Sequence, residues 1–311
     1  MRVVVCGEAL IDLIPDNSVP GTTQSSLWQA HSAGGPLNTA IALARLGMPA
    51  QFLGRLGGDG FGAQLRSHLA VNDVGLDLTV QTEAEPTSLA IVSVDSTGQA
   101  TYTFHLRNTA NFNWRPEDLP ELTADDWLHT GSLVAVVEPG RSTLLDYLAR
   151  TPARLSFDLN VRPTVEPDPG RYAELLDPFL TVLGERGGIV RASDEDLRWL
   201  DPCSGASAQE LAAGMARDHG LDMVVVTVGG QGAFAVGADR ELASVPGIPT
   251  AVADTVGAGD TFTAGFLKVW LDEQDLTEAM RSGCAAASIT CSRIGADPPD
   301  ADEVAALLAR S

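Results

Sequence analysis

Residues 254–266 carry the densest set of chemically informative side chains in this sequence. They read Asp-Thr-Val-Gly-Ala-Gly-Asp-Thr-Phe-Thr-Ala-Gly-Phe, so three small residues directly precede Asp260. Phe262 and Phe266 then recur at helical spacing, which predicts that a helix begins at the small residues. Backbone N–H groups at a helix start lack intrahelical partners, and the helix dipole is positive there. The segment therefore predicts an anion-binding site.

A carboxylate stands beside this predicted anion site. Gly257, Ala258 and Gly259 have little or no side chain, so an anion can approach their backbone closely. Asp260 would repel that anion unless it handles a proton, and the pairing therefore predicts transfer of a phosphoryl group to a hydroxyl. The alternative interpretation is a glycine-rich turn in which Asp260 only caps the helix.

A second glycine-rich segment, residues 33–40, opens another predicted helix. Gly34 and Gly35 permit close backbone approach, and the amide of Asn38 offers both a donor and an acceptor to a polyol. Asp12 follows the first predicted strand and is suited to accept hydrogen bonds from two vicinal hydroxyls. Each of these residues taken alone fits capping or turn formation equally well.

The composition excludes several classes of protein. The chain has 311 residues, 44% of them apolar and 20% charged, which is typical of a soluble globular protein. A net charge of −21 argues against nucleic acid as a partner. No uncharged apolar run is long enough to span a membrane, and residues 3–6 read as a buried strand and not as a signal peptide. We expect a cytoplasmic protein.

The counts of cysteine and lysine narrow the chemistry further. The four cysteines show no C-x-x-C spacing, so we expect free thiols in a reducing compartment and no structural zinc. Lys268 is the only lysine, and the residues around it do not form the Gly-Lys-Ser/Thr string of a Walker-type phosphate loop. Its place in an apolar helix also argues against Schiff-base chemistry.

Short apolar runs alternate with helical periodicity along most of the chain. Such alternation predicts a mainly parallel sheet covered by helices, and hence an α/β fold. The expected strands are residues 3–6, 51–54, 155–158, 188–191 and 223–228. The expected helices are residues 37–46, 61–71, 143–150, 208–219 and 276–292, and residues 167–170 are expected to form a loop.

Two segments interrupt this alternation. Residues 13–32 are polar and loop-like, with Pro15, Pro20 and Gly21, whereas residues 86–111 alternate as antiparallel strands around a turn at residues 96–98. We expect residues 12–32 and 86–111 to form a small β lid that excludes water from the reaction. Residues 1–11, 33–85 and 112–311 would then form the α/β core. The alternative is a hairpin without a function.

The chain resembles the ribokinase-like (PfkB) family of carbohydrate kinases. The family's N-terminal signature matches residues 33–57, and its C-terminal signature matches residues 254–267. Residues 7–12 look like the opening of bacterial fructokinases, and the resemblance covers essentially the whole chain. It implies a ribokinase-like three-layer sandwich with a mainly parallel central sheet. Further matching strings are residues 54–62, 158–163, 193–196 and 227–232.

The resemblance also implies a role for each motif residue. Asp260 would be the base for a primary hydroxyl of the sugar, beside an anion hole made by Gly257, Ala258 and Gly259. The sugar would be held by Asp12, Gly34, Gly35 and Asn38. The ATP would be bound by Asn160, Ser193, Thr227, Gly229, Gly232, Gly257 and Gly259. Asp196 would organise the water shell of Mg²⁺, and Asp254 belongs to a loop that in many members binds a monovalent cation, usually K⁺.

The sequence departs from the family pattern in three places. Asp196 stands where the family commonly has glutamate, which shortens the carboxylate that faces the magnesium shell. Cys284 stands near the expected adenine site, where relatives often carry asparagine, so the nucleotide preference is open. Arg107 in the lid either reaches the sugar or points to solvent.

The leading hypothesis is an ATP-dependent sugar kinase that converts fructose to fructose 6-phosphate. The alternative is a 2-keto-3-deoxygluconate kinase, whose substrate carboxylate calls for an arginine; Arg162 and Arg107 are the candidates. Ribokinase or nucleoside kinase activity comes next, and a non-catalytic sugar sensor on the same fold is the alternative from another class. We expect a small sugar and ATP as ligands, no nucleic acid or membrane partner, and a homodimer formed through the lid.

Overall fold

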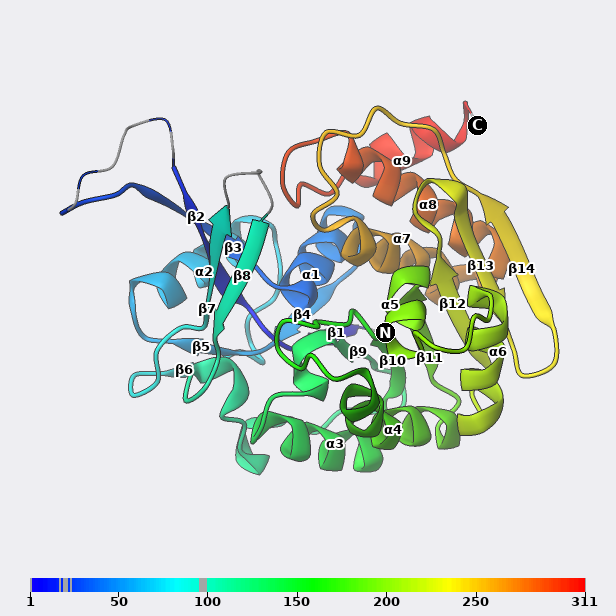
Figure 1. Ribbon diagram of the computed structural model, residues 1–311, viewed down its shortest axis with the longest axis horizontal. Helices are drawn as coiled ribbons and strands as arrows, with labels where there is room; N and C mark the ends of the chain where they lie inside the picture. Colours follow the sequence, from blue (N-terminus) through cyan, green and yellow to red (C-terminus); the bar gives the residue numbers. More distant parts are fainter. Residues whose placement is uncertain (1, 17, 19–21, 23, 95–99, 311) are drawn as a thin grey trace.

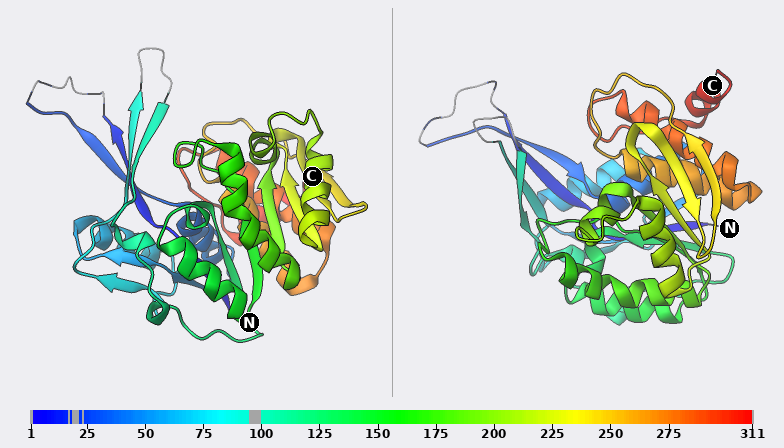
Figure 2. Two further views of the ribbon diagram at one scale, coloured as in Figure 1. Left: turned by 60° about the horizontal axis from the view of Figure 1, so that its bottom comes forward. Right: turned by 45° about the vertical axis from the view of Figure 1, so that its right-hand side comes forward.

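The central feature of the computed structural model is an eight-stranded sheet with helices on both faces (Figures 1 and 2). The model describes residues 2–16, 18, 22, 24–94 and 100–310. Pro20, Gly21 and the turn expected at residues 96–98 lie outside the described residues. The layers confirm the three-layer α/β sandwich that the sequence predicts.

The strands of the central sheet lie in the order β14-β13-β12-β11-β10-β9-β1-β4. The six strands from β12 to β4 pair in parallel, and β13 and β14 add an antiparallel edge. Continuous apolar runs form the parallel strands because both faces of the sheet are covered. The bounds are β1 (Val3–Cys6), β4 (Ala50–Leu53), β9 (Trp127–Gly131), β10 (Arg154–Asp158), β11 (Ile189–Ser193), β12 (Met223–Thr227), β13 (Gly232–Val236) and β14 (Glu241–Pro246).

Alternate residues of each strand pack against different helices. In β1, Val3 and Val5 belong to the core under α1, α7 and α8, whereas Val4 and Cys6 belong to the core under α3, α4 and α6. No helix among the described residues is long and apolar enough to cross a membrane. The helices are α1 (Gly35–Arg45), α2 (Gly60–Val71), α3 (Gly140–Arg150), α4 (Pro169–Glu185), α5 (Asp194–Leu200), α6 (Ala208–His219), α7 (Ala258–Glu273), α8 (Leu276–Cys291) and α9 (Ala301–Leu308).

One expected loop is a helix start. Residues 167–170 contain two prolines and a glycine, which favoured a loop, but α4 begins at Pro169. The side chain of Asp168 caps this helix by accepting a hydrogen bond from the amide of Arg171 at 3.0 Å. Proline is well tolerated in the first turn of a helix because its missing N–H would have no intrahelical partner there.

A second, four-stranded sheet extends away from the core (Figure 2). Its strand order is β3-β2-β7-β8, so two segments of the chain that are far apart in sequence form one sheet. The loop-like description of residues 13–32 is wrong in part, because they include half of β2 and most of β3. The bounds are β2 (Leu10–Pro15), β3 (Trp28–Ala33), β7 (Leu89–Val94) and β8 (Ala100–His105).

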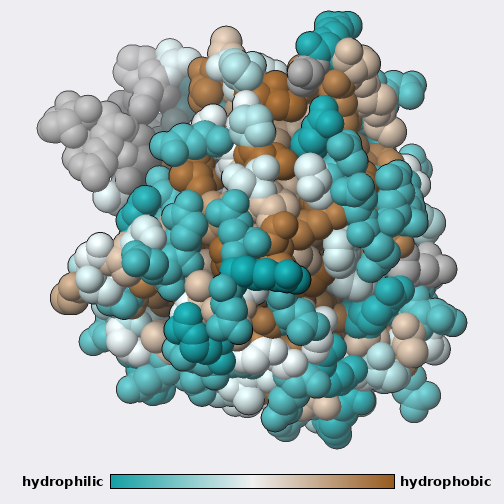
Figure 3. All heavy atoms as spheres, turned by 90° about the vertical axis from the view of Figure 1, so that its right-hand side faces the viewer, coloured by the Kyte–Doolittle hydropathy of each residue, from teal (hydrophilic) through white to brown (hydrophobic). Residues whose placement is uncertain are grey.

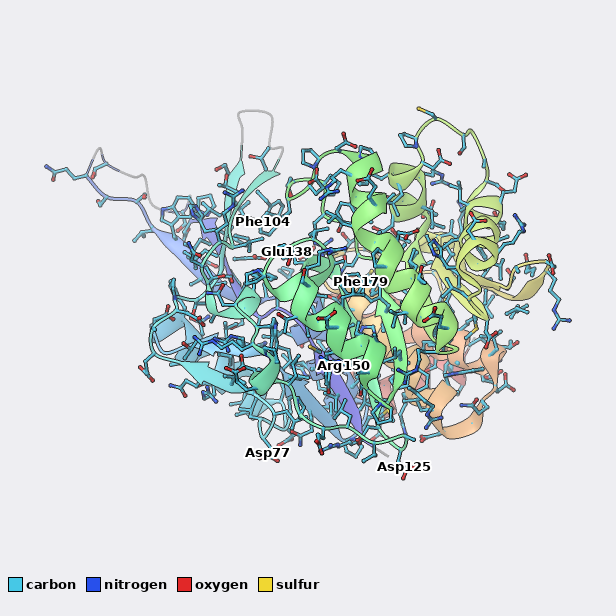
Figure 4. All side chains as sticks on the ribbon, turned by 90° about the horizontal axis from the view of Figure 1, so that it is seen from below. Asp77, Phe104, Asp125, Glu138, Arg150 and Phe179 are labelled. Carbon is cyan, nitrogen blue, oxygen red and sulfur yellow. The ribbon has the colours of Figure 1, made fainter. Side chains whose placement is uncertain are left out.

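The face of the molecule nearest β14 is largely hydrophilic, with a band of apolar residues near its middle (Figure 3). The view with side chains places Phe104 on the second sheet, close to where this sheet meets the core (Figure 4). Phe179 lies on α4 in the same view and is fully buried against Phe157 of β10, with ring centroids 5.6 Å apart. The second sheet therefore stands beside a densely packed core.

A buried arginine fixes both ends of the segment that forms β7 and β8. Arg55, in the short strand β5 (Arg55–Gly57) that pairs with β6 (Val80–Thr82), is 3% exposed. Its guanidinium forms ion pairs with Glu85 and Asp118 and donates a hydrogen bond to the carbonyl of Ala110 at 3.0 Å. These partners flank residues 86–109, so one side chain holds the base of the second sheet.

Replacing Arg55 with methionine should therefore destabilise the fold. The substitution leaves two largely buried carboxylates without a cation, and we expect the free energy of unfolding to fall by about 3–5 kcal/mol. Urea denaturation followed by circular dichroism measures it. Arg171→Met is the matched control, since its pair with Glu174 is exposed and contributes about 1 kcal/mol or less. Equal losses in the two variants would contradict the role of Arg55.

Candidate active site

A cavity of about 570 Å³ lies between the second sheet and the carboxyl ends of the parallel strands. A wider groove of about 670 Å³ between α4, α5 and α6 contains none of the residues that the sequence predicts for a site. The predicted site residues that line the cavity are Asp12, Gly34, Gly35, Asn38, Asn160, Arg162, Ser193, Asp196, Gly257, Gly259 and Asp260.

The start of α7 forms one wall of this cavity. Gly257 caps the helix in the left-handed conformation, with a φ of 74°, and α7 begins at Ala258. The amides of Gly257, Gly259 and Asp260 donate to no acceptor in the described part of the chain, whereas the amide of Ala258 donates to the carbonyl of Thr255 at 3.2 Å. Three amides of the predicted anion hole thus remain available to a ligand, and that of Ala258 is in use.

Asp260 lies in the first turn of α7 and is 7% exposed. The pKa of its carboxyl group is raised to about 6: burial raises it most, the hydrogen bond from Asn38 lowers it, and the charge of Asp158 raises it. That hydrogen bond runs from Nδ2 of Asn38 to Oδ2 of Asp260 over 2.8 Å. A carboxylate with this pKa is ionised at neutral pH and is a stronger base than an exposed aspartate.

Position 35 requires a glycine because two site residues approach its backbone. A Cβ atom at this position would lie 2.8 Å from Nδ2 of Asn160 and 3.1 Å from Oδ1 of Asp260. Any side chain there would displace one of these two groups. The second glycine-rich segment therefore lets α1 and α7 bring their first turns together.

Carboxylates and aromatic rings line the part of the cavity next to the second sheet. Asp12 is half-buried on β2, and burial raises its pKa to about 6. Glu8 also lines the cavity, is 2% exposed, and has an Oε2 atom without a partner in the described part of the chain. Tyr102 and Phe104 of β8, in the same sheet as Asp12, stack with ring centroids 6.2 Å apart and also line this part of the cavity.

The sequence interpretation overlooked Glu8 as a site residue. The available signal was an ionisable residue directly after a buried strand, in the same short string as Asp12. The carboxyl ends of parallel strands are the usual place for ligands in α/β folds. An acidic side chain at that end is therefore a candidate for contact with a ligand.

The structure separates the two candidate arginines. Arg162 lines the cavity and forms no ion pair with the described residues; its Nη1 donates to the carbonyl of Val161 at 3.4 Å. Arg107 is exposed and does not line the cavity. Of the two, only Arg162 is placed to meet an anionic group in this cavity.

Ser193 and Asp196 hold each other at the start of α5. Oδ2 of Asp196 accepts hydrogen bonds from the amide and the hydroxyl of Ser193, at 2.8 Å and 2.7 Å, and Oδ1 accepts one from the amide of Val161 at 2.9 Å. The described residues bring no three carboxylate, imidazole or thiolate groups together around a metal. Both oxygens of Asp196 already accept hydrogen bonds from the protein, so this carboxylate would reach a Mg²⁺ ion through waters.

Asp254 fixes the loop before α7. Its Oδ1 accepts hydrogen bonds from the amides of Thr255 and Val256, and its Oδ2 accepts one from Gly295 at 2.8 Å. Partial burial raises the pKa of this carboxyl, but these three hydrogen bonds hold it below its usual range. Asp254 itself does not line the cavity.

The residues expected along the nucleotide lie beyond the cavity wall. Thr227 ends β12, and Gly229 and Gly232 shape the turn into β13; none of the three lines the cavity. Cys284 is buried in the core on α8, where burial raises the pKa of its thiol to about 11. The structure thus brings together the residues predicted for the sugar and the phosphates, and leaves the turn from β12 to β13 beside them.

A buried ion pair completes the floor of the site. Arg191 of β11 lines the cavity, and its Nη1 lies 3.1 Å from both carboxylate oxygens of Asp158 on β10. In the sequence Arg191 ends a predicted apolar strand, residues 188–191, and it was not predicted as a site residue. Its position became visible only when β10, β11 and β12 were placed side by side.

Comparisons with known proteins agree with this geometry. The family model described as pfkB family carbohydrate kinase matches residues 1–303. A fructokinase of Klebsiella pneumoniae is 33% identical, with 86% of this chain and 83% of that protein covered. A fructokinase of Rhizobium leguminosarum bv. trifolii is 37% identical, with 85% and 78% covered.

Solved structures agree as well. The fructokinase of Xylella fastidiosa with bound ATP superposes with a TM-score of 0.86 at 25% identity, covering 99% of this chain and 98% of that one. A double mutant of the Vibrio cholerae O395 fructokinase, in a form with fructose, ADP and a potassium ion bound, gives a TM-score of 0.80 at 27% identity, with 99% and 97% covered. This chain transfers a phosphoryl group from ATP to a hydroxyl of a sugar, and it belongs to the pfkB family of carbohydrate kinases.

Proposed function

We propose that this kinase phosphorylates fructose at its primary 6-hydroxyl, with Asp260 as the base. The observation that carries the proposal is the position of Asp260, a buried carboxylate at a helix start whose neighbouring amides have no acceptor in the described chain. A carboxylate beside an anion site is useful when a proton must leave as negative charge arrives. The fructokinases among its relatives support fructose as the sugar.

The reaction follows from this arrangement. The O–H bond of the 6-hydroxyl breaks and its proton passes to Asp260, while the oxygen forms a bond to the γ-phosphorus of ATP. The bond from that phosphorus to the bridging oxygen breaks, and its electron pair leaves on ADP. The free amides of Gly257, Gly259 and Asp260 donate to the transferring oxygens. Holding the reactants in line contributes on the order of 7–11 kcal/mol, and one such donor about 3–4 kcal/mol.

The remaining site residues have proposed roles around this centre. Asp12, Gly34, Gly35 and Asn38 hold the sugar, with Glu8 as a further contact. Asp196 would hold Mg²⁺ through waters, and the ion would supply positive charge to the phosphates. K⁺ would bind near the loop of Asp254, as supported by the Vibrio cholerae structure that holds potassium. Asn160, Ser193, Thr227, Gly229 and Gly232 are proposed to contact the nucleotide.

Three coarser features are proposals of the same kind. The second sheet would act as a lid over the sugar, with residues 12–32 and 86–111 as the lid and the rest as the core. A second copy of the chain could pack on the lid, because Ile14, Trp28 and Tyr102 on its strands are 38%, 43% and 42% exposed. A cytoplasmic location is supported by the use of ATP and by four free cysteines.

A second candidate, 2-keto-3-deoxygluconate, is favoured by one observation. Arg162 lines the cavity without an ion pair among the described residues and could bind the carboxylate of that sugar acid. Five carboxyl groups of the protein line the same cavity and oppose an anionic sugar: those of Glu8, Asp12, Glu195, Asp196 and Asp260. The balance of charge favours a neutral sugar.

Replacing Asp260 with asparagine tests the general-base role. The amide keeps the shape of the side chain but cannot take a proton, so we expect kcat to fall by about 100- to 10,000-fold. Binding of fructose and ATP, measured by calorimetry, should stay within about threefold. Asp272→Asn is the matched control, because Asp272 lies at the far end of α7 and pairs with the exposed side of Lys268 rather than with a site residue. A loss of less than tenfold in Asp260→Asn would rule out the base.

A substrate panel tests the identity of the sugar. ADP release is measured with fructose, ribose, 2-keto-3-deoxygluconate and adenosine in the presence of ATP and Mg²⁺, with and without K⁺. We expect kcat/KM for fructose to exceed that for each other substrate by at least about tenfold. The cavity is lined by five carboxyl groups and two guanidinium groups, and one guanidinium is already paired with Asp158, so the lining favours a neutral sugar. If kcat/KM is higher for 2-keto-3-deoxygluconate than for fructose, that sugar acid replaces fructose as the proposed substrate, and the assignment as a sugar kinase stands.

A further inference from the structure

Arg191 is a charged residue at an apolar position of the central sheet. In β11, Ile189, Val190 and Ala192 are buried, and the side chain of Arg191 between them is only 11% exposed. A buried guanidinium is costly unless other groups compensate its charge and its hydrogen bonds. The compensating groups come from the strands on either side.

Three neighbouring strands fix the orientation of this guanidinium. Nη1 lies 3.1 Å from both carboxylate oxygens of Asp158, the residue that faces Arg191 on β10. Nη2 donates to Oγ1 of Thr227, at the end of β12, over 2.6 Å. Asp158 is 4% exposed, so the pair is held in a region with little water. Arg191 therefore has one defined position at the carboxyl ends of β10, β11 and β12.

The guanidinium also lies against the start of α7. A Cβ atom at Gly259 would be 2.8 Å from Nη1, 3.0 Å from Nη2 and 3.2 Å from Cζ of Arg191. Close approach of an anion is thus not the only reason for a glycine at this position. The residue must also be small enough to admit the face of the guanidinium.

This contact places two positive features together. The first turn of a helix carries a partial positive charge, and a cation next to it is unfavourable unless an anion is near. Asp158 compensates the guanidinium from one side. The amides of Gly257, Gly259 and Asp260, on the other side, have no acceptor in the described part of the chain. The arrangement is suited to an anion with more than one negative charge.

We propose that Arg191 is a positioning residue for phosphoryl transfer. Its guanidinium is fixed by Asp158 and Thr227, packs against the start of α7, and stabilises the negative charge of the phosphoryl group that the free amides of α7 bind. The proposal rests on the proposed role of Asp260 and adds to it a cation that acts through the helix start. It also gives Asp158 a role, as the anion that holds this cation in place.

The charges around Asp260 give the proposal a distinctive test. The charged and titratable groups that face it are Glu8, Asp158, Arg162 and Arg191. The pKa of Asp260 is raised to about 6 by the sum of these effects: burial and the charge of Asp158 raise it, whereas the hydrogen bond from Asn38 and the charges of Arg162 and Arg191 lower it. Removing the charge of Arg191 must therefore raise the pKa of Asp260, and removing the charge of Asp158 must lower it.

The experiment is the dependence of kcat on pH at saturating fructose and ATP. The wild-type rate should fall as the pH drops through about 6, because Asp260 is then protonated and cannot accept a proton. In Arg191→Met this acid limb should move to higher pH, and the plateau rate should fall about 100-fold. In Asp158→Asn the limb should move to lower pH.

Two further measurements separate position from folding. Arg191→Lys keeps the charge and loses the paired contacts, so its acid limb should stay near that of the wild type while its plateau falls about tenfold. The KM for fructose should remain within about threefold of the wild-type value in every variant. Thermal unfolding of each variant checks that it is folded. If Arg191→Met does not fold, the direction in which the acid limb of Asp158→Asn moves tests the proposal by itself: a move to lower pH supports it, and a move to higher pH overturns it.

The outcomes are distinguishable from those of the proposed function. Shifts of the acid limb in the same direction for Arg191→Met and Asp158→Asn, or an unchanged plateau in Arg191→Met, would overturn the role of Arg191. If the wild-type enzyme shows no acid limb near pH 6 and the Asp260→Asn variant is active, the role of Asp260 as the base is overturned instead.

Discussion

The hydrogen bond from Asn38 to Asp260 is the contact on which the site depends. It joins the first turns of α1 and α7 across 222 residues of sequence over 2.8 Å. The hydroxyl of Thr39 supports it by donating to the backbone carbonyl of Asp260 at 3.5 Å. Both helices start with small residues, so their first turns can approach one cavity. Without this hydrogen bond, α1 and its sugar-binding residues would not be held next to Asp260. The start of α7 would then attract an anion but would have no sugar hydroxyl beside it.

The rest of the fold holds the walls of that cavity in position. The parallel order of β1, β9, β10 and β11 brings the segments after these strands to one edge of the sheet, where ligands bind in α/β folds. Arg55 holds the base of the second sheet through ion pairs with Glu85 and Asp118. The carboxyl group of Asp12 and the rings of Tyr102 and Phe104 reach the cavity from the same second sheet. This sheet offers a sugar both a hydrogen-bond acceptor for its hydroxyls and ring faces for its carbon atoms.

Much of this could be predicted from local sequence. The starts of α1 and α7 were predicted because small residues followed by apolar periodicity are a local signal, and the structure begins these helices at Gly35 and Ala258. Continuous apolar runs likewise predicted β1, β10 and β12. The strand β9 was missed because His129 and Thr130 occupy buried positions in it and interrupt the apolar pattern.

Other parts depend on contacts that no local pattern contains. Strand β14 was missed because its edge position leaves polar residues exposed. The role of Arg191 depends on Asp158 and Thr227, which lie 33 and 36 residues away and meet it only through the strand order. The direction of Arg107, in the turn after β8, is likewise a property of tertiary packing, and the structure leaves it exposed.

The most direct test of the central claim is a crystal structure of the protein with fructose, Mg²⁺ and a non-hydrolysable ATP analogue. We predict the 6-hydroxyl of fructose within about 3.2 Å of a carboxylate oxygen of Asp260. The terminal phosphate should accept hydrogen bonds from the amides of Gly257, Gly259 and Asp260. A 6-hydroxyl directed away from Asp260, or a terminal phosphate bound elsewhere than at the start of α7, would contradict the account.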